Sequence, residues 1–106
     1  MPKYLFRASL TAEGVAGIVA EGGTARRTAV TSAIESLGGT VEAYYFCFGD
    51  EDSILIADLP DNETATAFAL EVGSSGRVGV STTVLITPEE VDRARAIKSG
   101  WRAPGD

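Results

Sequence analysis

The sequence predicts an α+β fold in which helices pack on one face of an antiparallel four-stranded sheet. Three observations predict it. Four short segments alternate their side chains at the period of a β-strand, and the segments between them repeat apolar residues at helical spacing. Glycine pairs and polar turns separate these segments. At 106 residues the chain has the length of one domain, covering residues 1–106.

Capping residues and helix breakers set the ends of the predicted elements. Thr11 and Asp61 suit helix N-caps, and glycine pairs at 22–23 and 38–39 end helices. Residues 87–90 combine an N-cap threonine, a proline at the first helical position and a glutamate at the third, which is the clearest helix start in the chain. The predicted elements are strands at 3–10, 40–48, 53–58 and 77–86, a short helix after Thr11, and helices at 25–37, 63–72 and from 88 to about Lys98.

The order β-α-β-β-α-β followed by an extra C-terminal helix is the ferredoxin-like arrangement. Its core covers about residues 3–91, and the extra helix and tail cover 88–106. The helices leave one sheet face open, yet the central strands are mostly apolar on both sides. We therefore expect a second copy to cover that face in a sheet-mediated homodimer, or a higher homo-oligomer, of the dimeric α/β-barrel type. The alternative is that the C-terminal helix and Trp101 fold back over it. In the second strand, strict alternation places Val41, Ala43, Tyr45 and Cys47 on one face and Glu42, Tyr44, Phe46 and Phe48 on the other.

Composition excludes several classes of function. No histidine is present, which removes His-based catalytic triads and histidine metal sites. Nine basic against fifteen acidic residues and a net charge of −6 argue against nucleic-acid binding. The single cysteine, Cys47, cannot form an internal disulfide. Because no signal peptide and no membrane-spanning run are evident, we expect a soluble cytoplasmic protein with no cofactor, no bound metal and no membrane partner.

The whole chain resembles the GYD-domain family, small proteins of unassigned biochemical function. The resemblance covers about residues 3–91, and it implies a ferredoxin-like subunit similar to the dimeric α/β-barrel proteins. That superfamily includes cofactor-free monooxygenases, isomerases, haem enzymes and regulatory ligand-binding modules, so the fold does not choose a function. In the family the glycine-to-aspartate turn typically contains a tyrosine just before the aspartate, where this chain has Glu51. The segments that carry the likeness are residues 3–6, 21–27, 48–52, 57–61 and 82–85.

Two groups of residues are candidates for a ligand site. Arg26 and Arg27 follow a glycine-rich loop in the first turn of a helix, where they could bind a carboxylate or phosphate. The alternative is that they pair with surface acids. The second group could converge in a cleft between sheet and helices and consists of Tyr4, Arg7, Tyr45 and Asp58. The acidic turn at 50–52 could hold a cation, but turns favour aspartate in any case.

Three functions stay open on this sequence. The first is a homo-oligomeric module, not an enzyme, that binds a small anionic molecule. The second is a cofactor-independent enzyme that uses tyrosine, arginine and aspartate, supported by fold analogy alone. The third is a purely structural assembly unit. An enclosed cleft that holds a tyrosine or a carboxylate with a shifted pKa would favour the enzyme.

Overall fold

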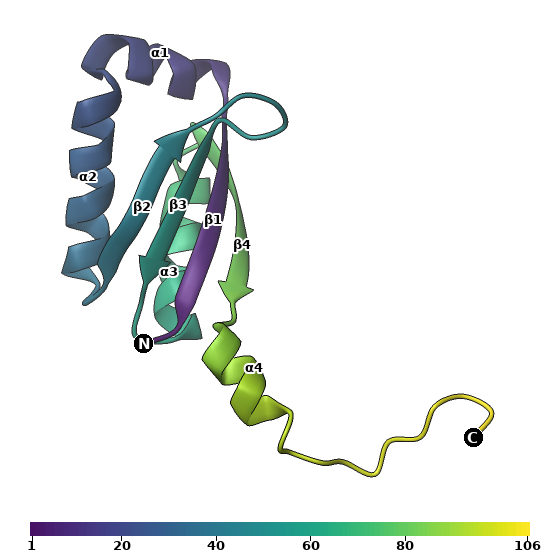
Figure 1. The fold of residues 1–106 in the computed structure, drawn as a ribbon. Coiled ribbons are helices and arrows are strands. Elements are labelled where there is room, and N and C mark those ends of the chain that lie inside the picture. The colour runs from purple at the N-terminus through teal and green to yellow at the C-terminus, as the bar shows by residue number, and fades with distance from the viewer.

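A computed structural model describes all residues, 1–106, and confirms the predicted α+β architecture. Four strands form one antiparallel sheet in the order β2-β3-β1-β4, which is consistent with a ferredoxin-like fold (Figure 1). No helix is both long and apolar enough to cross a membrane. The elements are β1 (Lys3–Leu10), α1 (Ala12–Glu21), α2 (Gly23–Ser36), β2 (Thr40–Phe46), β3 (Ser53–Asp58), α3 (Asn62–Ser74), β4 (Val78–Leu85) and α4 (Pro88–Ala94).

The predicted caps at Thr11, Asp61 and Thr87 are present and start three of the helices, whereas the N-cap expected at Thr24 is wrong because α2 already begins at Gly23. The Thr11 side chain accepts a hydrogen bond from the Gly14 N–H, and the Asp61 carboxylate accepts one from the Thr64 N–H. At α4, Thr87 and Glu90 form the predicted capping box. No side chain caps α2, because Gly22, with φ at 87°, precedes its first residue. The first N–H groups of α2 are therefore left without a side-chain partner.

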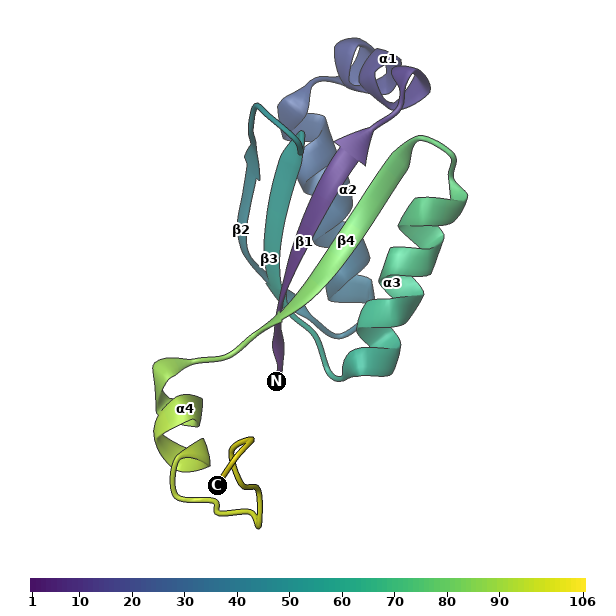
Figure 2. The same cartoon turned by 90° about the vertical axis from the view of Figure 1, so that its right-hand side faces the viewer.

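The core lies between one face of the sheet and the helices α2 and α3. Both helices lie on the same side of the sheet, α2 nearer β2 and α3 nearer β4 (Figures 1 and 2). Tyr4 and Phe6 of β1 point into this layer, and Phe68 of α3 meets the Phe6 ring edge-on at 5.1 Å between centroids. The buried apolar side chains are Tyr4, Phe6, Ile34, Leu55, Ala57, Leu59, Ala65 and Phe68.

A β-bulge in β2 changes which residues share a face. The register with β3 shifts between Val41 and Ala43, so one extra residue, Glu42, is inserted there. Tyr44 pairs with the buried Leu55 and Val41 with the buried Ala57, which places both on the helix-covered face. The prediction that Val41 shares a face with Ala43 and Tyr45 is therefore wrong. Strict alternation fails because the bulge adds a residue without advancing the pairing.

The C-terminal arm, residues 86–106, leaves the sheet instead of covering it. β4 ends at Leu85, and the arm runs away from the body, opposite the end that carries α1 (Figures 1 and 2). The radius of gyration is 17.1 Å, against about 13 Å for a compact domain of this length. The alternative in which Trp101 covers the open face is thus not the arrangement found. α4 ends at Ala94, earlier than the predicted Lys98.

Candidate functional site

A cavity of about 280 Å³ lies between the helix-covered face of the sheet and the helices. Most of its lining is apolar and comes from the sheet and from three helices. Phe6 and Leu55 contribute from the sheet, Val30 from α2, Phe68 from α3 and Ile18 from α1. A mostly apolar cavity with few polar groups is the usual form of a small-molecule site.

Five polar side chains line this cavity, namely Arg26 from α2, Tyr44 from β2, Ser53 from β3, Glu71 from α3 and Ser75 at the C-cap of α3. Burial raises the pKa of the Tyr44 phenol, while a hydrogen bond from the Ser53 hydroxyl and the nearby Arg26 charge act against that rise. Tyr44 therefore stays protonated at neutral pH and can donate its O–H. Its ring meets Phe46 edge-on at 5.5 Å, which fixes the phenol against the cavity wall.

Arg26 is the polar group of this site that lacks a complete set of partners. Its Nη1 lies 3.5 Å from the Glu21 Oε1, a long ion pair in which both side chains remain partly exposed. Its Nε is buried and has no hydrogen-bond partner. An unpaired buried donor costs about 1–3 kcal/mol, so an acceptor supplied from outside would be stabilised there. Arg26 also lies in the first turn of the uncapped helix α2, where the dipole favours an anion.

The other predicted residues do not join this site. Arg27 is exposed on α2 and does not line the cavity. Tyr4 is buried, and its O–H donates to the Asn62 Oδ1 at 2.6 Å. Burial, followed by the negative charge of Asp61, raises the pKa of Tyr4. Tyr4 is thus tied into the contact between β1 and the start of α3.

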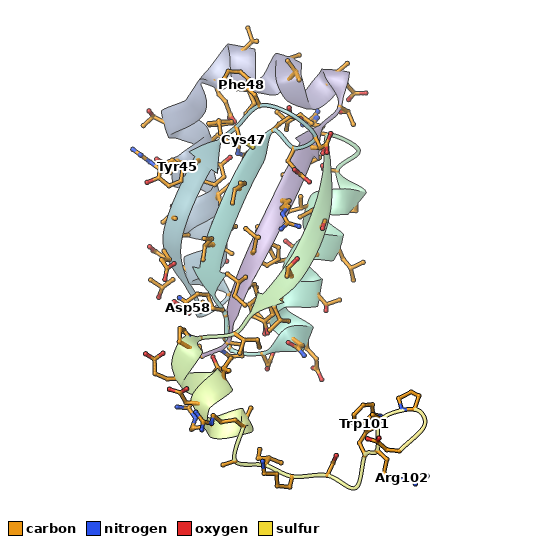
Figure 3. The ribbon with its side chains drawn as sticks, turned by 45° about the vertical axis from the view of Figure 1, so that its right-hand side comes forward. Tyr45, Cys47, Phe48, Asp58, Trp101 and Arg102 are labelled. Carbon is orange, nitrogen blue, oxygen red and sulfur yellow. The ribbon has the colours of Figure 1, made fainter.

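Arg7, Tyr45 and Asp58 lie on the open face of the sheet, opposite Tyr4. In β1, Arg7 and Tyr4 are three residues apart and so point to opposite sides. Tyr45 belongs to the edge strand β2 and Asp58 to the neighbouring inner strand β3, and both are labelled in Figure 3, which looks onto this face. The expected convergence of these residues with Tyr4 in one cleft is therefore wrong. The alternation of the strands separates them.

Asp58 already has a partner on the open face. Lys3 Nζ lies 3.0 Å from the Asp58 Oδ1 and 2.7 Å from the Glu42 Oε1. These hydrogen bonds, the one to Glu42 first, raise the pKa of Lys3. The three side chains form an ion-pair network that joins β1, β2 and β3 at one end of the sheet.

The acidic turn at residues 50–52 has a structural part. The Asp52 Oδ2 accepts a hydrogen bond from the Leu10 N–H at 2.7 Å, which fastens the β2–β3 loop to the end of β1. No group of three or more acidic or cysteine side chains is close enough to hold a metal ion. The turn therefore acts as a loop anchor in this structure.

The sequence offers the aromatic run Tyr44, Tyr45, Phe46 and Phe48 as residues that could line a pocket, and Tyr44 and Phe46 do line the cavity, whereas Ser53 was missed. One signal was available for Ser53, because it shares a face of β3 with the buried Leu55 and Ala57, where a hydroxyl needs a partner. The aromatic run does not by itself say which of its members face the helices, as Tyr44 does. The position of Tyr44 at the cavity depends on the bulge at Glu42, which periodicity does not predict.

Comparisons with known proteins agree with this fold. A search of curated proteins gives no match. The chain is similar to the solved structure titled "Crystal Structure of MtbAldR", with a TM-score of 0.61 and 20% identity over 81% of this chain and 53% of that one. This likeness shows the fold alone, and the chain spans about half the length of MtbAldR. The model of the GYD domain matches residues 4–94. The resemblance inferred from the sequence is thereby confirmed, and the chain belongs to the GYD-domain family.

Proposed function

We propose that this GYD domain is a homo-oligomeric module that binds a small organic anion in the cavity beneath its helices. The observation that carries the proposal is the buried, unpaired Nε of Arg26 in the lining of a mostly apolar cavity. The guanidinium suits a carboxylate, because its N–H groups match the two carboxylate oxygens. The apolar lining suits a hydrophobic body attached to that carboxylate.

The size of the cavity and its polar groups narrow the ligand class. A volume of about 280 Å³ lies just below the usual range of ligand pockets, about 300–1,000 Å³, so the ligand is small. Tyr44 offers an O–H donor beside Arg26 and, with its raised pKa, does not act as a general base at neutral pH. Donors that stay protonated favour binding of an anion over proton abstraction from a substrate. This supports the binding module in preference to the cofactor-independent enzyme.

A thermal-shift experiment with matched probes tests the site. Benzoate and its neutral isostere benzamide have similar apolar bodies and differ in charge. We expect benzoate to raise the melting temperature and benzamide to raise it less. At one hundred times its Kd, a bound ligand adds about 2.7 kcal/mol to the free energy of unfolding. Arg26→Ala should abolish the difference between the probes. Arg27→Ala removes the same charge from an exposed position of the same helix, so it should behave like the wild type.

Two results would overturn the binding proposal. The first is an equal response of the Arg26→Ala and Arg27→Ala variants to benzoate. That result would mean that benzoate responds to the net charge of the protein and not to a site at Arg26. The second is the absence of any shift with a panel of aromatic and branched aliphatic carboxylates. Arg26→Lys offers a finer comparison, since it keeps the charge and loses the fork of donors. We expect it to bind benzoate more weakly than the wild type and more strongly than Arg26→Ala.

The homo-oligomer part of the proposal is supported by the open sheet face. Leu5, Ile54 and Ile56 lie there side by side on β1 and β3, and no element of the chain covers them. Only ten of the 106 residues are buried, and the accessible surface is 7203 Å², against about 5,600 Å² for a compact protein of this mass. The arm that leaves the body accounts for part of this excess, and a standard interface covers about 800 Å² on each partner.

Analytical ultracentrifugation measures this assembly. We expect the wild type to sediment as a dimer or a larger species at micromolar concentration. Ile56→Asp, which buries a charge in the proposed interface, should give monomers. Ser32→Asp, on the exposed surface of α2, is the matched control and should sediment like the wild type. Wild-type protein that sediments as a monomer would refute the assembly, while the cavity proposal would still stand on its own test.

A further inference from the structure

The C-terminal arm carries apolar side chains that are largely exposed. Ile86, Val91, Ile97 and Trp101 are 54–79% exposed. Trp101 and Arg102 lie at the far end of the arm, well away from the sheet (Figure 3). Exposed tryptophan and isoleucine on an extended segment are unfavourable in water, and such segments commonly mark interaction sites. The arm therefore has the character of a docking segment whose partner lies outside this chain.

Positive charge is concentrated in the outer part of the arm, although the whole arm, residues 86–106, also carries Glu89, Glu90, Asp92 and Asp106 and has no net charge. Residues 93–105 contain four basic and no acidic side chains, namely Arg93, Arg95, Lys98 and Arg102. Residues 28–76, by contrast, contain nine acidic side chains and no basic one. Oppositely charged surfaces on one protein attract when two copies meet. The separation of charge along the sequence thus favours contact between residues 93–105 of the arm and the acidic part of the body.

A surface that complements the arm lies on the loop between β2 and β3. Phe48 at its tip is fully exposed, and Tyr45 beside it is 69% exposed. Asp50 and Glu51 follow directly, and neither side chain has a hydrogen bond or an ion pair. This loop therefore offers an aromatic anchor flanked by carboxylates. The arm offers a tryptophan flanked by cations.

The two surfaces cannot meet within one chain. Figure 3 shows Phe48 and Trp101 at opposite ends of the molecule, whose long axis measures 59 Å. In a two-fold dimer with the open faces together and the strands of the copies running in opposite directions, each arm leaves its own sheet where the other copy's loop lies. The arm and the loop would then be neighbours twice in each dimer.

We propose that the arm of one copy docks on the β2–β3 loop of a second copy, with Trp101 against Phe48 and the arm's cations facing Asp50 and Glu51. This inference rests on the proposed homo-oligomer, and it adds that the C-terminal arm of each copy binds the other copy. An aromatic pair at such a contact contributes beyond its buried area, and the surrounding charges set the register.

Disulfide cross-linking between two single-cysteine variants tests the contact. Both carry Cys47→Ser, which removes the native thiol and keeps a donor for the Glu51 carbonyl. One adds Phe48→Cys and the other Trp101→Cys, at positions exposed enough for the fold to tolerate the change. A disulfide forms only where the two Cα atoms approach within about 7 Å. We expect the oxidised mixture to give a heterodimer, identified by its mass, in several-fold excess over a control mixture of Leu70→Cys with Trp101→Cys.

A charge exchange gives an independent measurement in the same assay. Arg95→Glu with Lys98→Glu in the copy that donates the arm should lower the yield of the heterodimer. Asp50→Lys with Glu51→Lys in the copy that presents the loop should lower it as well. Combining the two reversed copies should restore it, as expected for direct pairing. High salt should weaken the native pairing.

The outcomes separate this inference from the proposed function. Wild-type dimers in the ultracentrifuge with no heterodimer above the Leu70 control would overturn the arm contact and leave the homo-oligomer in place. Monomeric wild-type protein would overturn both. Charge reversal in the arm that leaves the cross-link unchanged would show that the arm does not recognise the acidic loop, and would also overturn the inference.

Discussion

Gly39→Ala should destabilise the domain, because a methyl group has no room at the junction of α2 and β2. A Cβ at this position would lie 2.7 Å from the Leu59 Cδ2 and 3.0 Å from the Ile34 Cγ2, and closer still to the carbonyl oxygen of Asp58. Ile34 and Leu59 are fully buried, and a backbone oxygen cannot rotate away. The end of α2 must therefore move away from the edge of the sheet.

The size of the effect follows from that geometry. Overpacking in a closed core costs about 1–3 kcal/mol, and the contact with backbone places Gly39→Ala at the upper end. The glycine also donates its N–H to the Ile34 carbonyl at 3.0 Å, a bond that a displaced helix end would strain. With a urea dependence of about 1–3 kcal/mol per molar, the unfolding midpoint should fall by roughly 1 M or more.

Gly17→Ala is the matched control, because the same substitution at this position should raise the free energy of unfolding instead of lowering it. Gly17 lies within α1 and has open space around its Cα. Alanine there should stabilise the helix by up to about 1 kcal/mol. Urea denaturation followed by circular dichroism measures both variants. If Gly39→Ala unfolds at the same urea concentration as Gly17→Ala, or at a higher one than the wild type, the packing at this junction is not as described.

Three further predictions concern single side chains. Tyr4→Phe removes the hydrogen bond to Asn62 and should lower the free energy of unfolding by about 0.5–1.5 kcal/mol; a loss above 3 kcal/mol in urea titration would mean that Tyr4 does more than make this bond. Phe68→Ala empties a buried ring site and should cost about 3–5 kcal/mol in the same measurement, so a cost below 1 kcal/mol would contradict its place in the core. Hydrogen bonds from Thr64 lower the pKa of the Asp61 carboxyl, so its stabilising effect is present above its usual pKa and is lost as the pH falls through the lowered value. The melting temperatures of wild type and Asp61→Ala should therefore differ at pH 7 and converge in strong acid, and a gap that stays constant would refute the cap.

Local patterns predicted the elements because helix and strand period, caps and breakers act within a few residues. Thr11, Asp61 and Thr87 cap the helices that the sequence assigns to them. The opening strand occupies residues 3–10 as predicted. Residues 40–48 were too long by two, because pairing with β3 stops at Phe46, where the chain turns into the loop.

The candidate site was predicted only in part. Arg26 was a candidate from its place in a helix start after a glycine-rich loop, and it lies at the cavity. Arg7 and Tyr45 were grouped with Tyr4, although the pleat of the sheet sends them to the opposite face. Tyr44 reaches the cavity through one inserted residue at the bulge. A cavity itself reflects how far helices stand from strands, and that distance depends on side chains from separate parts of the chain.

The sequence by itself determined the class of fold, the ends of most elements, the membership of the GYD-domain family and the absence of histidine chemistry. These properties depend on composition and on patterns within a few residues, and both can be read from the sequence without knowing how distant segments pack. The tertiary structure alone decided that Arg26, Tyr44 and Ser53 share one cavity and that the arm leaves the open face bare. Such relations join residues that lie far apart in the sequence, and only packing in three dimensions brings them together or keeps them apart.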